Sequence, residues 1–157
     1  MTQRDPYEEK LHHFIEEHRI QAEHLYFETS CHSVAEAARA AQTTPDALIK
    51  SICMIDGDGK LVVAIVKGED RVSAAHVGAA LGTPSPRMAT PEEMLARTGY
   101  PCGGTPPFGF EATFLIDPRV FELEMLYAGG GSERALIRIT PQELQRVNGA
   151  LISPIKK

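Results

Sequence analysis

Residues 99–109, with the sequence Gly-Tyr-Pro-Cys-Gly-Gly-Thr-Pro-Pro-Phe-Gly, have the composition of a loop that could bind a ligand through its backbone. Proline fixes φ and cannot continue a helix or sit in a central strand. Glycine allows positive φ and leaves backbone N–H groups uncovered, because no Cβ stands between them and a ligand. The stretch therefore predicts a rigid, ligand-facing loop. The alternative is a connection with a purely structural role.

Lys50 is the second candidate. It follows a short helical segment predicted from Thr44-Pro45-Asp46 and precedes the apolar run Ser51–Ile55, which is typical of a strand. A lysine at this junction would place its ammonium at the mouth of a sheet. Taken alone, such a lysine is more often an ordinary surface residue.

Other patterns give weaker indications of chemistry. Cys102 could be a nucleophile in an exposed loop, but no histidine lies near it in the sequence, and most free cysteines are simply packed. Gly129-Gly130-Gly131 matches neither a phosphate-binding loop nor a dinucleotide fingerprint, and it indicates a hairpin turn. The six histidines lack the spacing of a metal-binding helix, and no Gly-x-Ser-x-Gly elbow is present. No metal site is expected at His12, His13, His18, His24, His32 or His76.

Length and composition predict one globular domain over residues 1–157, with 43% hydrophobic residues available for a core. The net charge of −5 argues against indiscriminate binding to polyanions, although it permits a small basic pocket that grips one end of a nucleic acid. Three cysteines without C-x-x-C spacing argue against a disulfide framework or a structural zinc site. With no apolar run long enough for a membrane span and no signal-peptide core, the expected location is the cytoplasm.

The predicted elements must position the loop and the lysine. Helix signals and strand signals intermix without a regular βαβ rhythm, and Asp56-Gly57-Asp58-Gly59 is a strong hairpin turn between two apolar runs. The pattern favours a mixed α/β (α+β) domain with a largely antiparallel or mixed sheet. Helices are expected at 6–19, 34–41, 73–81, 91–98 and 141–148, with a short helical segment from residue 44 to near residue 50. Strands are expected at 22–28, 51–55, 61–67, 112–116, 124–128 and 135–139.

In this order of elements the chain resembles the YbaK/EbsC family, which also occurs as the editing insertion domain of bacterial prolyl-tRNA synthetases. The resemblance covers about residues 20–149. Its most specific parts are Lys50 after the short helix and the Gly-Gly-x-x-Pro-Phe-Gly loop. The matching pieces are Ser33–Ala38, Leu48–Ser51, Leu61–Val66, Ala89–Glu93, Thr98–Tyr100, Gly103–Gly109 and Tyr127–Gly130.

The resemblance implies a curved sheet or barrel surrounded by helices, and a trans-editing hydrolase that deacylates mischarged aminoacyl-tRNA. Lys50 is then the site lysine, and Gly103 and Pro107 frame the family's G-x-x-x-P loop. Ester hydrolysis builds negative charge on the carbonyl oxygen, and fixed amides of Gly103, Gly104 and Thr105 could stabilise it or orient the attacking water. The expected substrate-binding residues are Phe27, Lys50, Ser51, Pro107, Phe108, Gly129 and Gly130.

Two departures from the cysteine-specific members bear on the substrate. A tyrosine near the start of the pocket is replaced by Phe27, and an aspartate in the last strand falls near Ile137. Because both changes remove polar groups, the cysteine preference does not carry over. Small side chains around the site suggest alanine, serine, threonine or cysteine as the esterified residue, since a synthetase pocket rejects smaller or isosteric residues poorly and needs a second sieve.

The resemblance implies no cofactor and no metal. The expected partner is the aminoacylated 3′ end of tRNA, with an aminoacyl-tRNA synthetase as a further candidate and no DNA or membrane partner. The alternative function is a non-catalytic module that holds an RNA 3′ end or a small ligand in the same pocket. A cysteine hydrolase acting through Cys102 is the third hypothesis.

Overall fold

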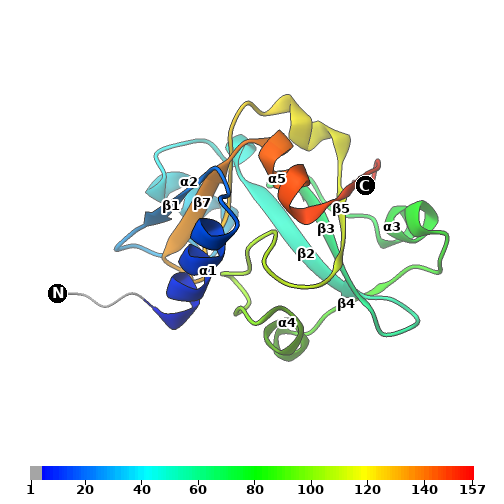
Figure 1. The fold of residues 1–157 in the computed structure, drawn as a ribbon. Coiled ribbons are helices and arrows are strands. Elements are labelled where there is room, and N and C mark those ends of the chain that lie inside the picture. Colours follow the sequence, from blue (N-terminus) through cyan, green and yellow to red (C-terminus); the bar gives the residue numbers. More distant parts are fainter. Residues whose placement is uncertain (1–4) are drawn as a thin grey trace.

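The computed structural model describes residues 5–157, so the expected domain start at residue 1 lies outside the described residues. Within that range the chain forms five α-helices, two 3-10 helices and eight strands (Figure 1). In chain order the elements are α1 (Pro6–Glu17), β1 (Ala22–Tyr26), α2 (Val34–Ala40), η1 (Pro45–Ala47), β2 (Ile49–Ile55), β3 (Leu61–Lys67), α3 (Ala74–Leu81), β4 (Arg87–Met88), α4 (Pro91–Thr98), β5 (Thr113–Ile116), η2 (Pro118–Glu122), β6 (Leu126–Gly129), β7 (Ala135–Ile139), α5 (Pro141–Asn148) and β8 (Leu151–Ile152).

The strands form two sheets. One has the order β1-β7-β6 and is antiparallel throughout, and the other has the order β4-β2-β3-β5-β8, in which β3–β5 and β5–β8 are parallel pairs. In Figure 1 the smaller sheet, α1 and α2 occupy one side of the molecule, and the larger sheet and α3 occupy the other. The predicted mixed α/β class is confirmed. The strands are divided between two sheets, however, and do not close into one barrel.

The β2–β3 hairpin was predicted by its turn residues, and it is confirmed. Its strands pair antiparallel from Ile49↔Lys67 to Ile55↔Leu61. Oδ1 of Asp56 accepts hydrogen bonds from the backbone N–H groups of residues 58 and 60, which closes the turn. One expectation needs correction: the helical segment ends at Ala47, so Lys50 is the second residue of β2 and does not lie at a helix end.

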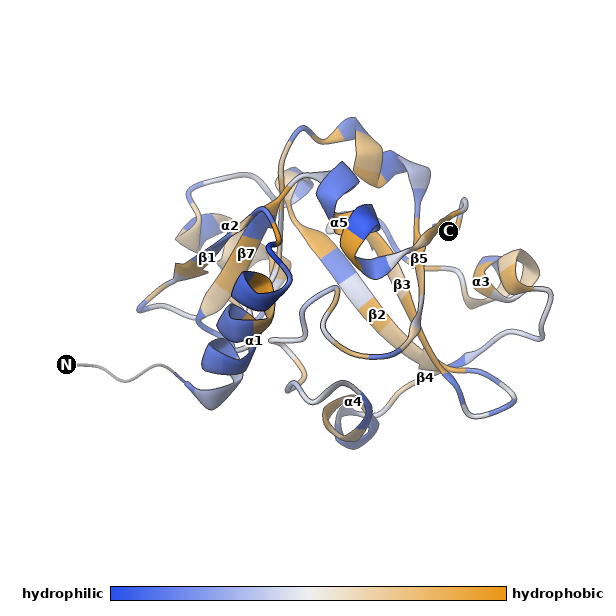
Figure 2. Ribbon diagram, viewed as in Figure 1, coloured by the Kyte–Doolittle hydropathy of each residue, from blue (hydrophilic) through white to orange (hydrophobic). Residues whose placement is uncertain are grey.

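The two faces of the β2–β3 hairpin pack against different clusters. Ile49, Cys53 and Ile55 join the main core between the two sheets, whereas Met54 joins a second cluster that α3 covers. All seven residues of β3 are buried, and Figure 2 shows this strand in the colours of apolar residues along most of its length. Alternation along β2 therefore decides which of the two clusters each buried side chain joins.

The predicted helix starts and stops are confirmed where capping residues mark them. At α4, Thr90 and Glu93 form a reciprocal capping box, and Gly99 ends the helix in the left-handed conformation with φ +80°. The Thr140 side chain caps α5 in the same way as Thr90 caps α4, by accepting from the third helical N–H. These local signals depend on a few adjacent residues, which is why the sequence alone reveals them.

Three elements, η2, β4 and β8, were not predicted from the sequence. Asp117 caps η2, and its buried carboxylate accepts three backbone N–H groups. The donors are Arg119 at 2.9 Å and, from the C-terminal segment, Ile155 and Lys156 at 3.0 Å each. Asp117 thus fastens the end of the chain to the larger sheet through contacts that are distant in sequence.

We expect Asp117→Ala to lower the free energy of unfolding by about 2–4 kcal/mol, because it leaves buried N–H groups without an acceptor. Urea denaturation measures the loss. Asp58→Ala, in the exposed hairpin turn, is the control and should change stability by less than about 0.5 kcal/mol. Equal effects of the two substitutions would contradict the anchoring role of Asp117.

Candidate active site

A cavity of about 360 Å³ lies alongside the free edge of β2, where the strand faces the 101–105 loop and the end of β6. Its volume is at the lower end of the range for small-molecule sites, roughly 300–1,000 Å³. The cavity brings together five of the site residues expected from the sequence. They are Lys50, Ser51, Gly103, Thr105 and Gly129.

Five expected residues lie outside the cavity lining. Phe108 is 1% exposed and belongs to the main core, where it stacks on Phe14, so it cannot contact substrate in this arrangement. Pro107 is also buried, and its carbonyl accepts a hydrogen bond from Asn148. Phe27 packs against the cluster around Cys31 and lines a neighbouring hollow.

Gly130 also lies outside the cavity lining, in the β6–β7 turn. Its N–H donates to Ala135, and its carbonyl contacts Nε2 of His24 at 2.7 Å. Gly104 is the fifth of these residues. It belongs to the 101–105 loop but is buried and does not line the cavity. The positions of Phe27, Pro107, Phe108 and Gly130 therefore do not support their predicted substrate-binding roles in this cavity. Phe108 and Pro107 are buried, Gly130 is held in the β6–β7 turn, and Phe27 lines the neighbouring hollow.

The backbone of the 101–105 loop is partly engaged by internal hydrogen bonds. The N–H of Gly104 and the hydroxyl of Thr105 both donate to the carbonyl of Pro101, each at 3.0 Å. The Gly104 N–H is therefore unavailable as a donor to a ligand, which corrects the expectation for this residue. Among the hydrogen bonds of residues 5–157, none uses the N–H of Gly103 or Thr105, so these two amides are the remaining candidates.

Glycine is required in this loop for close approach to other segments. Gly103 has φ +89°, and a Cβ there would overlap Nδ1 of His32. A Cβ on Gly104 would lie 2.7 Å from the backbone of Ser132, and one on Gly129 would overlap the carbonyl oxygen of Thr105. The glycines therefore allow the loop to pack tightly against the β6–β7 connection.

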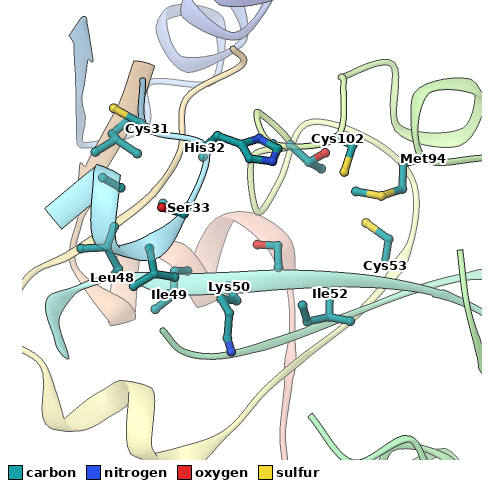
Figure 3. A pocket seen from close by; sticks show the side chains of 18 of the residues that line it. Cys31, His32, Ser33, Leu48, Ile49, Lys50, Ile52, Cys53, Met94 and Cys102 are labelled. Carbon is teal, nitrogen blue, oxygen red and sulfur yellow. The ribbon is translucent and has the colours of Figure 1, made fainter. Parts of the chain in front are cut away.

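Lys50 is among the residues that line the cavity, and in Figure 3 its side chain extends from β2 on the side opposite to Cys53, with the ammonium pointing away from His32 and Cys102. Burial lowers the pKa of Lys50, and the nearby positive charge of Arg71 lowers it further, whereas Asp70 acts in the opposite direction. Asp70 is itself bound by Arg119 at 2.6 Å. No ion pair between described residues neutralises Lys50, so its ammonium is available to an anionic ligand.

Sulfur atoms gather at one end of the cavity. Cys53, Met94 and Cys102 meet there in Figure 3. Burial, assisted by Cys102, raises the pKa of the Cys53 thiol to about 12, and burial together with the charge of Glu36 raises that of Cys31 to about 11. Both thiols therefore stay protonated near neutral pH and are poor nucleophiles. Cys102 is exposed.

His32 also lines the cavity, and sequence reasoning missed it by treating it as isolated. Its Nδ1 lies 3.3 Å from Oε1 of Glu133, which stands in the β6–β7 connection. Figure 3 shows the ring reaching toward Cys102. No spacing in the sequence links His32 to Glu133, so only the pairing of distant segments brings them together.

Within residues 5–157, no group of three or more His, Cys, Asp or Glu side chains is arranged to hold a metal ion. The helices of this part of the chain are too short or too polar to cross a membrane. The side chains of Lys50, Ser51 and His32 line the cavity, and His32 is paired with Glu133, which lies outside the lining. The unengaged amides of Gly103 and Thr105 belong to the loop that forms another part of its wall. Such a set can bind an anionic or ester-containing ligand and polarise a carbonyl.

Comparison with known proteins shows the family to which this chain belongs. Residues 28–147 match the model of the aminoacyl-tRNA editing domain, and the chain belongs to that family. The crystal structure of a "putative trans-editing enzyme for prolyl tRNA synthetase" superposes with a TM-score of 0.89 at 27% identity, covering 99% of each chain. The crystal structure of hypothetical protein APE2540 gives a TM-score of 0.87 at 26% identity, covering 94% of this chain and 99% of the other.

Two curated relatives place the family in context. YwhH of Bacillus subtilis is 26% identical over 120 residues, which covers 75% of this chain and 76% of YwhH. The proline–tRNA ligase of Moorella thermoacetica is 31% identical over 99 residues, which covers 63% of this chain and only 16% of the ligase. The resemblance to prolyl-tRNA synthetases stated from the sequence is confirmed as one to a small part of the ligase.

We expect one thiol of the folded protein to react rapidly with a disulfide reagent such as DTNB at neutral pH, and three after unfolding. Cys102 is exposed, whereas Cys31 and Cys53 are buried with raised pKa values. Cys102→Ser should abolish the rapid reaction. Rapid labelling of two or three thiols in the folded wild type would contradict this assignment.

Proposed function

We propose that the protein is a free-standing trans-editing deacylase that hydrolyses the ester between a wrong amino acid and the 3′-terminal ribose of tRNA. The observation that carries the proposal is the joining of Lys50 to the Gly103 loop in one cavity, within a chain that matches the aminoacyl-tRNA editing domain. Phe108 and Pro107 hold the loop in this proposal. They do not bind substrate.

The reaction proceeds by attack of water on the ester carbonyl. Negative charge develops on the carbonyl oxygen, and the unengaged N–H groups of Gly103 and Thr105 stabilise it. Lys50 holds the terminal phosphate or ribose, or adds its charge to this stabilisation. In this proposal no step uses a metal, and we expect deacylation to persist in excess EDTA.

The cavity walls indicate a small amino acid. Ala89, Ala128 and Cys53 lie along the wall, and no aspartate or glutamate lines the cavity to bind a charged side chain. Alanine, serine, threonine and cysteine fit this description, and a large side chain would not fit beside the ribose. Ile137 is fully buried in the core, so the substrate meets no polar group at that position.

Charge distribution supports an RNA end as the partner. The protein carries a net charge of −5, so a long polyanion would be repelled. At the cavity rim, however, Lys50 lies close enough to Arg71 for the two positive charges to interact. A pair of cations at the mouth favours the terminal phosphates of tRNA. A synthetase that supplies the mischarged tRNA is a further proposed partner.

We expect Lys50→Ala to reduce deacylation at least ~100-fold, which corresponds to about 3 kcal/mol of lost transition-state stabilisation. The melting temperature should change little, because Lys50 is only half-buried and forms no ion pair with a described residue. Lys60→Ala, in the exposed hairpin turn, is the matched control and should remain active. Near-normal turnover by Lys50→Ala would refute the role of Lys50.

A panel of tRNAs, each esterified with a different amino acid, tests the proposal as a whole. Deacylation of the alanine, serine, threonine or cysteine ester is expected, with little action on esters of large residues. Binding of uncharged and charged tRNA without deacylation of any member would instead establish the non-catalytic binding module.

We expect Gly103→Ala to lose at least tenfold more activity than the loss of folded protein explains. Alanine at φ +89° is strained by about 1–2 kcal/mol, and its Cβ would displace the exposed ring of His32. For a domain of this size the strain corresponds to a drop of a few degrees in melting temperature. Melting temperature and rate are measured together, and activity that falls only with folded protein would assign the loop a structural role.

A further inference from the structure

Three loops meet at the side of the cavity where His32 stands. The backbone N–H of Cys31 donates to the carbonyl of Glu133, which ties the loop after β1 to the β6–β7 connection. That connection is tied in turn to the Gly-rich loop, because the N–H of Gly131 donates to the carbonyl of Gly104 at 2.8 Å. These backbone hydrogen bonds hold in place the loop on which His32 lies.

The Glu133 carboxylate favours one tautomer of the His32 ring. A carboxylate only accepts hydrogen bonds, so its approach to within 3.3 Å of Nδ1 places the proton on Nδ1. In the neutral ring Nε2 then carries a lone pair. No hydrogen bond found within residues 5–157 engages Nε2. The pair therefore presents a proton acceptor at the wall of the cavity.

Other titratable groups around the ring do not supply this function. Lys50 donates hydrogen bonds and accepts none while it is charged. Glu36 lies on α2 near Cys31 and outside the cavity lining. Cys53 keeps its proton near neutral pH because its pKa is raised to about 12. Cys102 is the remaining neighbour, from the loop between α4 and β5, and its thiol points to the sulfur cluster in Figure 3.

We infer that Nε2 of His32 accepts the proton of the attacking water and that Glu133 is a positioning residue for the ring. The inference rests on the proposed function. The water oxygen bonds to the ester carbonyl carbon as its proton passes to Nε2. When the bond from that carbon to the ribose oxygen breaks, the protonated ring returns the proton to the leaving oxygen. The products are the free amino acid and a tRNA with a free ribose hydroxyl, so the ring is unchanged.

The first test is His32→Ala, measured with the aminoacyl-tRNA that the wild type hydrolyses best. Loss of general-base catalysis should reduce turnover about 100- to 10,000-fold. The side chain of His32 is 54% exposed, so the melting temperature should stay near that of the wild type. Added free imidazole should restore part of the activity of His32→Ala, because the cavity mouth is open where the ring is removed.

Two controls accompany the rescue. His76→Ala removes an exposed histidine outside the cavity and should neither lose activity nor respond to imidazole. A reaction without enzyme corrects for hydrolysis of the ester by imidazole itself. Glu133→Ala should reduce turnover about tenfold in the wild-type background and should have no further effect in His32→Ala, because positioning residues act only through the ring.

Three outcomes would overturn the inference. Wild-type turnover by His32→Ala, alongside inactive Lys50→Ala, would remove His32 and leave the proposed function standing. A large loss without any imidazole response would show a structural role. Additive losses in the His32→Ala, Glu133→Ala double variant would show that the two side chains act independently. A wild type that deacylates no member of the panel would instead refute the proposed function itself.

Discussion

The close approach of two glycine-containing segments is the constraint on which the site depends. The carbonyl oxygen of Thr105 occupies the space that a Cβ on Gly129 would need, and a Cβ on Gly104 would lie 2.7 Å from the backbone of Ser132. A hydrogen bond from Gly131 to Gly104 then fixes the two segments to each other. Because one segment continues from α4 and the other joins β6 to β7, this contact holds the Gly-rich loop to the smaller sheet. The cavity is the space left between that joint and the edge of β2.

This joint determines which groups can carry chemistry. Side chains are absent where the backbones touch, so the joint itself offers only backbone groups. Hydrogen bonds within the loop leave the N–H groups of Gly103 and Thr105 unengaged there. Ionisable side chains must come from outside the joint. They come from Lys50 on a strand paired along its whole length, and from His32 on a loop tied to Glu133. Rigid amides together with ionisable groups at the rim suit the ester hydrolysis that we propose.

The sequence predicted what depends on adjacent residues. Caps, the β2–β3 hairpin and the Gly-rich loop were recognisable, and Lys50 and Gly103 do share a cavity. Phe108 was misassigned because a loop aromatic can turn inward, and only packing decides that it belongs to the core. His32 was missed because its partner Glu133 is distant in the chain. Division of the strands into two sheets also depends on long-range pairing.

A comparison of two lysines on the β2–β3 hairpin shows why Lys50 is the available cation. Lys67 is almost fully buried, yet its ammonium lies 2.7 Å from Asp46, with Glu69 and Glu122 also in reach. The hydrogen bond to Asp46 raises the pKa of Lys67, so this charge is satisfied within the protein. The pKa of Lys50 shifts in the opposite direction, because burial and Arg71 both disfavour its charge. An anion arriving at Lys50 relieves that repulsion, whereas at Lys67 it would have to displace a carboxylate.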